Sequence, residues 1–264
     1  MEKLVIPDFE TKKELYDFLM TNKDSLIAQK CSAIKFADGF EAHVNVLKNE
    51  VGVANKSTFD ENQTELTVKA VINTTNIMDS HGDVHLKGIW NKSLKENKRI
   101  MMLQEHKSNQ FDKIIASGDD LNATVKTYTW KELGYDVDGE TQALVFEAKV
   151  KKDRNPFMFE QYKQGYVDNH SVGMQYVKLN IAVNDEDYPL AKELYDNHIN
   201  EIANKADVEA KGYFWAVAEA KAIEGSAVPN GSNKITPTLS VKHATNVVEK
   251  TAKDLAIRKF LGLD

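Results

Sequence analysis

The chain has 264 residues, of which 42% are hydrophobic and 28% are charged, and its formal net charge at pH 7 is −6. A chain of this length and apolar content can bury one sizeable core. The negative net charge argues against a DNA or RNA ligand, because a phosphate backbone selects for clustered Lys and Arg. The short basic run at 149–154 is interpreted as the solvated entrance to a helix.

The cysteine content and the N-terminal sequence indicate the compartment. Cys31 is the single cysteine, so no intramolecular disulfide can form, which suits a reducing compartment. The sequence begins Met1-Glu2-Lys3 without an apolar signal core, and no stretch approaches the roughly 20 apolar residues that a membrane span requires. We therefore expect a cytoplasmic protein that is neither secreted nor inserted into a membrane.

The N-terminal region is expected to hold one helix followed by irregular sequence. From Thr11 to about Gln29 the apolar residues fall on one face at helical spacing, which predicts an amphipathic helix. Residues 34–62 are polar and less regular. We therefore interpret residues 1–62 as an N-terminal helix and an irregular lead-in, and we place the main domain at 63–235.

Several segments of the main domain have the features of short strands. They are 65–72, 100–105, 122–130, 143–150, 170–179 and 213–223. Turn residues separate most of them, and a set of short strands like this predicts an antiparallel sheet or barrel. The large aromatic residues are interpreted as its core: Trp90, Trp130, Phe146, Phe157, Phe159 and Trp215.

Two further helices are predicted within the main domain. Asn155 can cap the first, with Pro156 in its first turn and Gly165 at its end. The second runs from 185 to about 205, inside an unusually long connection between two predicted strands. We therefore expect a helical insertion at about 181–211.

The C-terminal region is predicted to be an appendage. A linker containing Gly, Ser and Pro occupies 229–240, and a helix is expected from 244 to 261. We interpret residues 236–264 as a C-terminal linker and helix.

Two short segments carry residues of nucleophilic catalysis. The segment 103–106 (LQEH) places His106 at the end of an apolar strand, and the segment 168–174 (DNHSVGM) places Ser171 on another. A serine hydroxyl is a poor nucleophile at neutral pH and needs an imidazole within hydrogen-bond reach to take its proton. The pair therefore predicts a serine hydrolase.

These two segments stand in order with the segments 76–90 (NIMDSHGDVHLKGIW), 114–118 (IIASG) and 222–230 (AIEGSAVPN). Together they resemble the prohead maturation proteases of tailed bacteriophages, a family related to herpesvirus assemblin. The resemblance covers about residues 65–235. It implies an α+β fold, a small and mostly antiparallel β-barrel flanked by helices, with N-terminal and C-terminal helical appendages, in which 63–235 is the protease domain.

The resemblance assigns a catalytic triad. Ser171 corresponds to the nucleophile, and His106 corresponds to the general base that accepts its proton and later protonates the leaving amine. Glu224 corresponds to the acid that orients the imidazole. Three features depart from the family pattern. Met174 stands where an aromatic residue is usual, the connection at 181–212 between the serine strand and the glutamate strand is unusually long, and Pro-Asn-Gly at 229–231 replaces Pro-Ala-Asn.

The third member of the triad stays open at this point. Glu219 lies on the same predicted strand as Glu224, Asp168 precedes the serine, and the herpesvirus relatives use a second histidine. His170 is a poor substitute, because adjacent residues of a strand point to opposite faces, so His170 faces away from any groove that Ser171 faces.

The function that the resemblance implies is that of a phage prohead serine endopeptidase, active in capsid maturation inside the immature prohead in the host cytoplasm. Its substrates would be the phage major capsid protein precursor and the scaffold protein, and it would also cleave itself; the family allows a homodimer and needs no cofactor. The alternative is a catalytically idle scaffold or structural protein of the phage head on the same fold. An esterase ranks last, because no Gly-x-Ser-x-Gly elbow occurs.

A metal site is the remaining candidate. His81, Asp83 and His85 alternate along a short segment and could project from one face of a strand, as metal ligands would. No fourth ligand is evident in the sequence, so no metal is expected.

Overall fold

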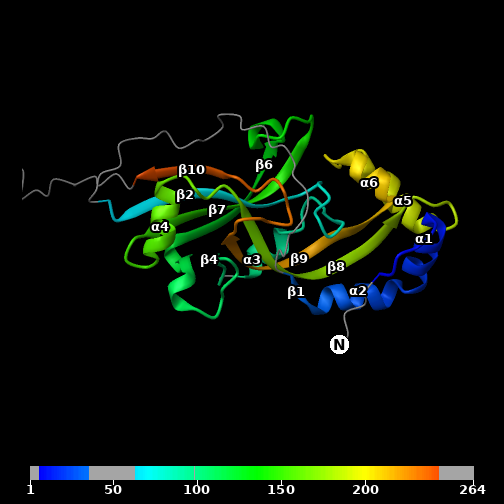
Figure 1. Ribbon diagram of the computed structural model, residues 1–264, viewed down its shortest axis with the longest axis horizontal. Coiled ribbons are helices and arrows are strands. Elements are labelled where there is room, and N and C mark those ends of the chain that lie inside the picture. Colours follow the sequence, from blue (N-terminus) through cyan, green and yellow to red (C-terminus); the bar gives the residue numbers. More distant parts are fainter. Residues whose placement is uncertain (1–5, 36–62, 98, 244–264) are drawn as a thin grey trace, which may run out of the picture.

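The computed structural model describes residues 6–35, 63–97 and 99–243 (Figure 1). Its first sheet contains β1 (Ile34–Lys35), β8 (His170–Val183), β9 (Tyr213–Ala227), β4 (Met101–Gln104) and β5 (Ile114–Ser117), in that order. β3 (Asp83–His85) also belongs to this sheet and pairs with β9. β9 is antiparallel to β8 along one edge; along the other it is parallel to β3 near its start and to β4 at its end.

The second sheet is antiparallel throughout. Its strands lie in the order β10 (Thr238–His243), β2 (Glu65–Thr74), β7 (Glu140–Lys151) and β6 (Leu121–Thr129). Alternate residues of β2 are fully buried and belong to the same apolar cluster as Val172 of β8 and Ala222 of β9. The two sheets therefore share one core, whose burial favours folding by about 25 cal/mol per Å² of apolar surface removed from water.

The mixed α+β class and the mostly antiparallel pairing are confirmed, but the closed barrel is wrong. Within the described residues each sheet keeps two edges, and no hydrogen-bonded ladder joins β5 of the first sheet to β6 of the second. These two strands are consecutive in the chain and are connected by the short 3-10 helix η2 (Gly118–Asp120). The chain therefore passes from one sheet to the other at this point instead of continuing the sheet into a cylinder.

Each of the six predicted strands coincides with an observed one, but four further strands lie outside those six. These are β1, β3, β5 and β10. The last of them begins at Thr238, so the predicted linker at 229–240 ends inside a strand that pairs with β2. The predicted helix at 244–261 lies outside the described residues.

The N-terminal helix is two helices rather than one. α1 (Lys12–Thr21) and α2 (Lys23–Ser32) meet at Asn22, whose side-chain amide donates to the Phe18 carbonyl at 2.8 Å. An asparagine bonded to its own backbone in this way competes with the continuing helix. Leu19 of α1 is fully buried in the main core, so the helices pack on the sheets.

The remaining helices are α3 (Asn91–Glu96), α4 (Pro156–Lys163), α5 (Pro189–Ile199) and α6 (Lys205–Lys211). Figure 1 shows α1, α2, α5 and α6 gathered at one end of the molecule and α4 at the other. α4 is capped as predicted, since the Asn155 side chain accepts from the Met158 backbone N–H. None of the described helices combines the length and the apolar character that a membrane crossing requires.

Two expectations for these helices are corrected. The helix predicted from 185 to about 205 is shorter than expected, since α5 covers only 189–199, and a separate helix, α6, begins at 205. Phe157 is 57% exposed rather than part of the core, since it lies on the outer face of α4, while the other aromatic residues assigned to the core are buried.

Candidate active site

Three neighbouring strands bring the predicted catalytic residues to one region. Ser171 of β8 lies opposite Ser226 of β9, and Gly173 lies opposite Glu224. On the other edge of β9, Ser226 lies beside Leu103 of β4, which leads directly to His106. Directly opposed residues, and residues two apart on one strand, point to the same face of a sheet. Ser171, Glu224 and Ser226 therefore share a face.

His106 follows β4 in a turn that bends its ring toward β9. Glu105 and His106 both have left-handed backbone conformations, with φ of 51° and 56°. The His106 Nδ1–H donates to Glu224 Oε1 at 2.6 Å, and both side chains are largely buried, being 11% and 1% exposed. Because Nδ1 carries the proton in this bond, Nε2 is the basic nitrogen of the neutral ring.

Ser226 joins the histidine and the carboxylate, and the sequence predictions gave it no role. Its hydroxyl donates to Glu224 Oε2 at 2.6 Å and accepts from the His106 backbone N–H at 3.0 Å. The signal that could have identified it is the Glu-x-Ser spacing, since residues two apart on a strand face the same side.

Gly173 makes room for the carboxylate. A Cβ atom at this position would lie 2.0 Å from Glu224 Oε1, so any other residue would force the Glu224 side chain to move. The pairing between β8 and β9 also shifts here, because Met174 lies opposite Ala222 and leaves Ile223 as an extra residue. A β-bulge of this kind re-aims the neighbouring side chain, in this case that of Glu224.

Ser171 is placed beside this cluster rather than bonded to it. Ser171 is 4% exposed. It lies directly opposite Ser226, and the Cα atoms of directly opposed residues on antiparallel strands are roughly 4.5 to 5.5 Å apart. Among the hydrogen bonds of the described residues, none joins the Ser171 hydroxyl to His106. Catalytic hydrogen bonds are often long in unliganded enzymes and tighten when substrate binds.

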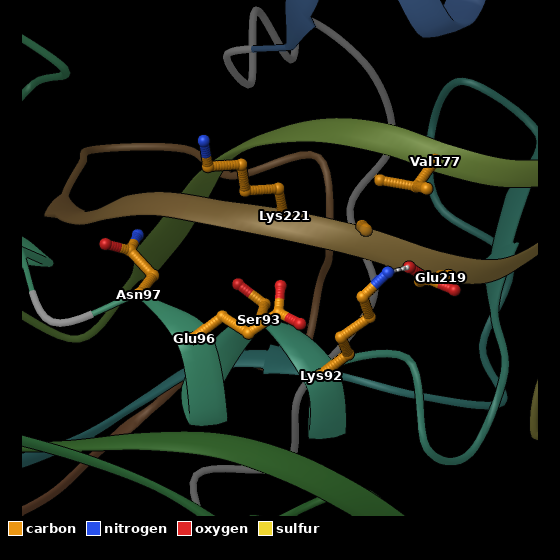
Figure 2. A pocket seen from close by; sticks show the side chains of 8 residues that line it. Lys92, Ser93, Glu96, Asn97, Val177, Glu219 and Lys221 are labelled. Atoms are coloured by element: carbon orange, nitrogen blue, oxygen red, sulfur yellow. Dashed lines mark ion pairs between the residues drawn. The ribbon is translucent and has the colours of Figure 1, made fainter.

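The other candidates for the acid do not contact His106 within the described part of the chain. The Glu219 carboxylate pairs with Lys178 at 2.8 Å and with Lys92 at 3.2 Å, and these lysines lower its pKa. Lys92 of α3 and Glu219 of β9 both line a hollow of about 300 Å³, and Figure 2 shows the Lys92 ammonium group directed at the Glu219 carboxylate. Asp168 precedes β8 and makes no hydrogen bond to His106.

His170 lies on the opposite face from Ser171, as alternation predicts. Its Nδ1–H donates to the Thr236 carbonyl at 3.0 Å, so its Nε2 accepts from the Tyr162 hydroxyl, also at 3.0 Å. Burial lowers the pKa of His170 to about 4, although the Thr236 carbonyl and the Asp168 charge act in the opposite direction. This histidine is therefore a neutral structural residue.

Two of the three residues considered as metal ligands, Asp83 and His85, serve a buried polar network instead, and His81 lies outside it. The Asn73 amide donates to His85 Nδ1 at 2.8 Å, and the Tyr176 hydroxyl donates to Asp83 at 2.7 Å. Asp83 also pairs with Lys30 of α2 at 2.5 Å. In the part of the chain that the structure describes, no group of three or more His, Cys, Asp or Glu residues is arranged to hold a metal ion, and the His81 side chain is 37% exposed.

A comparison with protein-family models, with curated proteins and with solved structures finds no match. The geometry itself defines what the cluster can do. A buried carboxylate on Nδ1 fixes the tautomer of an imidazole and stabilises its protonated form, which is the role of the acid in a Ser-His-acid triad. With a serine on the adjacent strand, this arrangement suits acyl transfer.

Proposed function

We propose that this chain is a serine endopeptidase, with Ser171 as nucleophile, His106 as general base and Glu224 as orienting acid. The observation that carries the proposal is the 2.6 Å hydrogen bond between His106 and Glu224 on the face of the sheet that Ser171 shares. Sequence order alone would not require a histidine and a glutamate 118 residues apart to meet beside a serine.

The reaction follows from these positions. The Ser171 Oγ attacks the scissile carbonyl carbon while its proton passes to His106 Nε2, and the resulting imidazolium is stabilised by Glu224. Collapse of the tetrahedral intermediate breaks the C–N bond, and the leaving amine takes the proton from His106. Water then hydrolyses the acyl-enzyme by the same route and restores the serine hydroxyl.

We further propose that the protease matures phage heads and shares an assemblin-like fold with the prohead proteases. Its substrates would be the phage major capsid protein precursor and the scaffold protein, cut inside the immature prohead in the host cytoplasm, with cleavage of its own chain as well. The support for this part is the order of the segments at 76–90, 103–106, 168–174 and 222–230. Three of them supply the residues that meet at the site.

A second candidate function is an idle scaffold or structural protein of the phage head on the protease fold. The observation that favours it is that no hydrogen bond joins Ser171 to His106 among the described residues. Chemical reactivity of the serine distinguishes the two functions.

The test is labelling with a fluorophosphonate, which phosphonylates an activated serine and releases fluoride. We expect the purified chain to gain one label on the peptide that contains Ser171, with no label in Ser171→Ala. His106→Ala should slow labelling by at least about 1000-fold, whereas the control His198→Ala, in α5, should label like the wild type. Equal labelling of the His106→Ala variant would contradict the proposed roles.

Co-expression with capsid and scaffold precursors tests the substrates. Fragment masses should show processing with the wild-type chain and intact precursors with Ser171→Ala and with His106→Ala. Intact precursors with all three chains, in shells that nevertheless assemble, would favour the idle structural protein.

A further inference from the structure

The turn that carries His106 has an unusual backbone. β4 ends at Gln104, and the next two residues, Glu105 and His106, both adopt left-handed conformations although neither is glycine. Such conformations persist only where surrounding contacts hold them, and they concentrate at functional sites. The position of the imidazole therefore depends on what holds this turn.

Two hydrogen bonds from β9 hold the turn. The Glu105 backbone N–H donates to the Ala227 carbonyl at 3.0 Å, which is an ordinary strand contact that any residue at 227 would make. The His106 backbone N–H donates instead to the Ser226 side-chain oxygen at 3.0 Å. This second bond depends on the identity of the residue at 226.

The same hydroxyl also holds the acid. Glu224 is 1% exposed, and its two carboxylate oxygens accept one bond each, from His106 Nδ1–H and from the Ser226 hydroxyl. A buried carboxylate that loses a donor is left with an oxygen that has no hydrogen-bond partner, and this lowers the stability of the folded state. Ser226 thus binds both ends of the His106–Glu224 pair, the backbone of one and the carboxylate of the other.

Ser226 cannot share its proton with the imidazole in this arrangement. A hydroxyl has one proton, and that of Ser226 is donated to Glu224 Oε2 at 2.6 Å. Ser171, directly opposite on β8, makes no such bond to the carboxylate among the described residues. The two facing serines therefore have different roles.

We propose that Ser226 is a positioning residue that fixes the imidazole of His106 and the carboxylate of Glu224 relative to each other. The proposal rests on the proposed protease function for its kinetic consequence only. Ser226 touches no reacting atom; it acts through His106, by keeping the left-handed turn closed, and through Glu224, by keeping one carboxylate oxygen bonded so that the other faces Nδ1.

The first test is kinetic. Ser226→Ala should lower kcat about 100-fold, the effect of a small misplacement of a catalytic group, and should leave KM within about twofold because substrate contacts are unchanged. Ser226→Thr keeps the hydroxyl on a strand position that favours β-branched residues, and should restore kcat to within about threefold of wild type. Equal losses in both variants would overturn the proposal.

The second test does not require activity. In the Ser171→Ala background, proton NMR should show a low-field resonance from the His106 Nδ1–H bonded to Glu224, and Glu224→Gln identifies it by removing it. We expect Ser226→Ala to shift or broaden this resonance and Ser226→Thr to retain it. An unchanged resonance in a folded Ser226→Ala protein would overturn the proposal. Loss of the resonance in a chain whose wild type cleaves nothing would support the positioning role and contradict the protease function.

Discussion

Two histidines lie close to Ser171 in the fold, and their surroundings differ in one decisive respect. His106 bonds through Nδ1 to a carboxylate, that of Glu224, whereas His170 bonds to a hydroxyl and a carbonyl, those of Tyr162 and Thr236. A carboxylate stabilises an imidazolium, and burial among neutral partners disfavours it. The histidine adjacent to the serine in sequence is therefore the structural one, and the distant histidine is suited to accept a proton.

The largest expected effect separates the two histidines directly. His106→Gln should lower the rate of fluorophosphonate labelling about 10,000-fold, because the proposed triad would lose its base. His170→Gln should leave the labelling rate of the folded protein within about tenfold and lower the free energy of unfolding by about 1 to 3 kcal/mol, because its buried hydrogen bonds are disturbed.

The measurements are labelling rates and urea unfolding on both variants. The comparison fails if His170→Gln loses as much activity as His106→Gln while remaining folded at the assay temperature. In that case proximity to Ser171, rather than a carboxylate partner, would determine which histidine matters.

A smaller effect appears in the pH dependence of stability. The pKa of His170 is about 4 in the folded chain and about 6.5 when unfolded, so below pH 6.5 the unfolded state binds a proton that the folded state does not. The contribution of the neutral His170 to the free energy of unfolding is complete above pH 6.5. It is lost as the pH falls toward 4, by about 3 kcal/mol in total.

Urea unfolding at pH 7, 6, 5 and 4 checks this prediction. His170→Gln is the matched control, because subtracting its curve removes the contribution of titrating carboxylates elsewhere in the chain. Parallel curves for the wild type and the variant would show that His170 does not stay neutral in the folded protein.

The smallest of the three effects uses two glycines that lie on opposite faces. Gly173→Ala would bring a methyl group against Glu224, so we expect about 100-fold slower labelling. Gly225→Ala would bring a methyl group 2.6 Å from Phe146 and 2.8 Å from Ile72, on the core face that His170 shares. It should lower stability by about 1 to 3 kcal/mol and leave labelling of the folded protein within about threefold.

Thermal unfolding and labelling rates are measured on both glycine variants, to compare the sheet face that carries Glu224 with the face that packs in the core. If Gly173→Ala unfolds the protein and Gly225→Ala slows labelling, the assignment of the two faces is wrong.

The elements with a long regular pattern could be predicted from the sequence. β2, β6, β7, β8 and β9 each have nine to 15 residues and are rich in strand-forming residues, and α4 carries its cap and its terminal glycine. β1, β3 and β5 have only two to four residues, which is too few to establish a period, and β10 follows residues typical of a linker. Closure into a barrel depends on which distant edges pair, and local pattern carries no such information.

The candidate site was predictable to a similar extent. His106, Ser171 and Glu224 are suggested by residue type, order and resemblance, and the structure brings His106 and Glu224 into contact. The role of Ser226 could have been inferred from its spacing to Glu224. The requirement for glycine at 173 could not, because it arises from a carboxylate on the neighbouring strand beside a β-bulge.

The pairing of β4 with β9 determines when, during synthesis of the chain, the residues of the candidate site can come together. β9 is inserted between β8 and β4, so the carboxylate at 224 reaches the imidazole at 106 only after the ribosome has released the chain through the end of β9. Contacts of such long sequence separation are slow to form, because closing the long intervening loop costs entropy before the contact is made. In a nascent chain that ends before β9, Ser171 and His106 are therefore present without Glu224. The contact between His106 and Glu224 can form only after β9 has been synthesised.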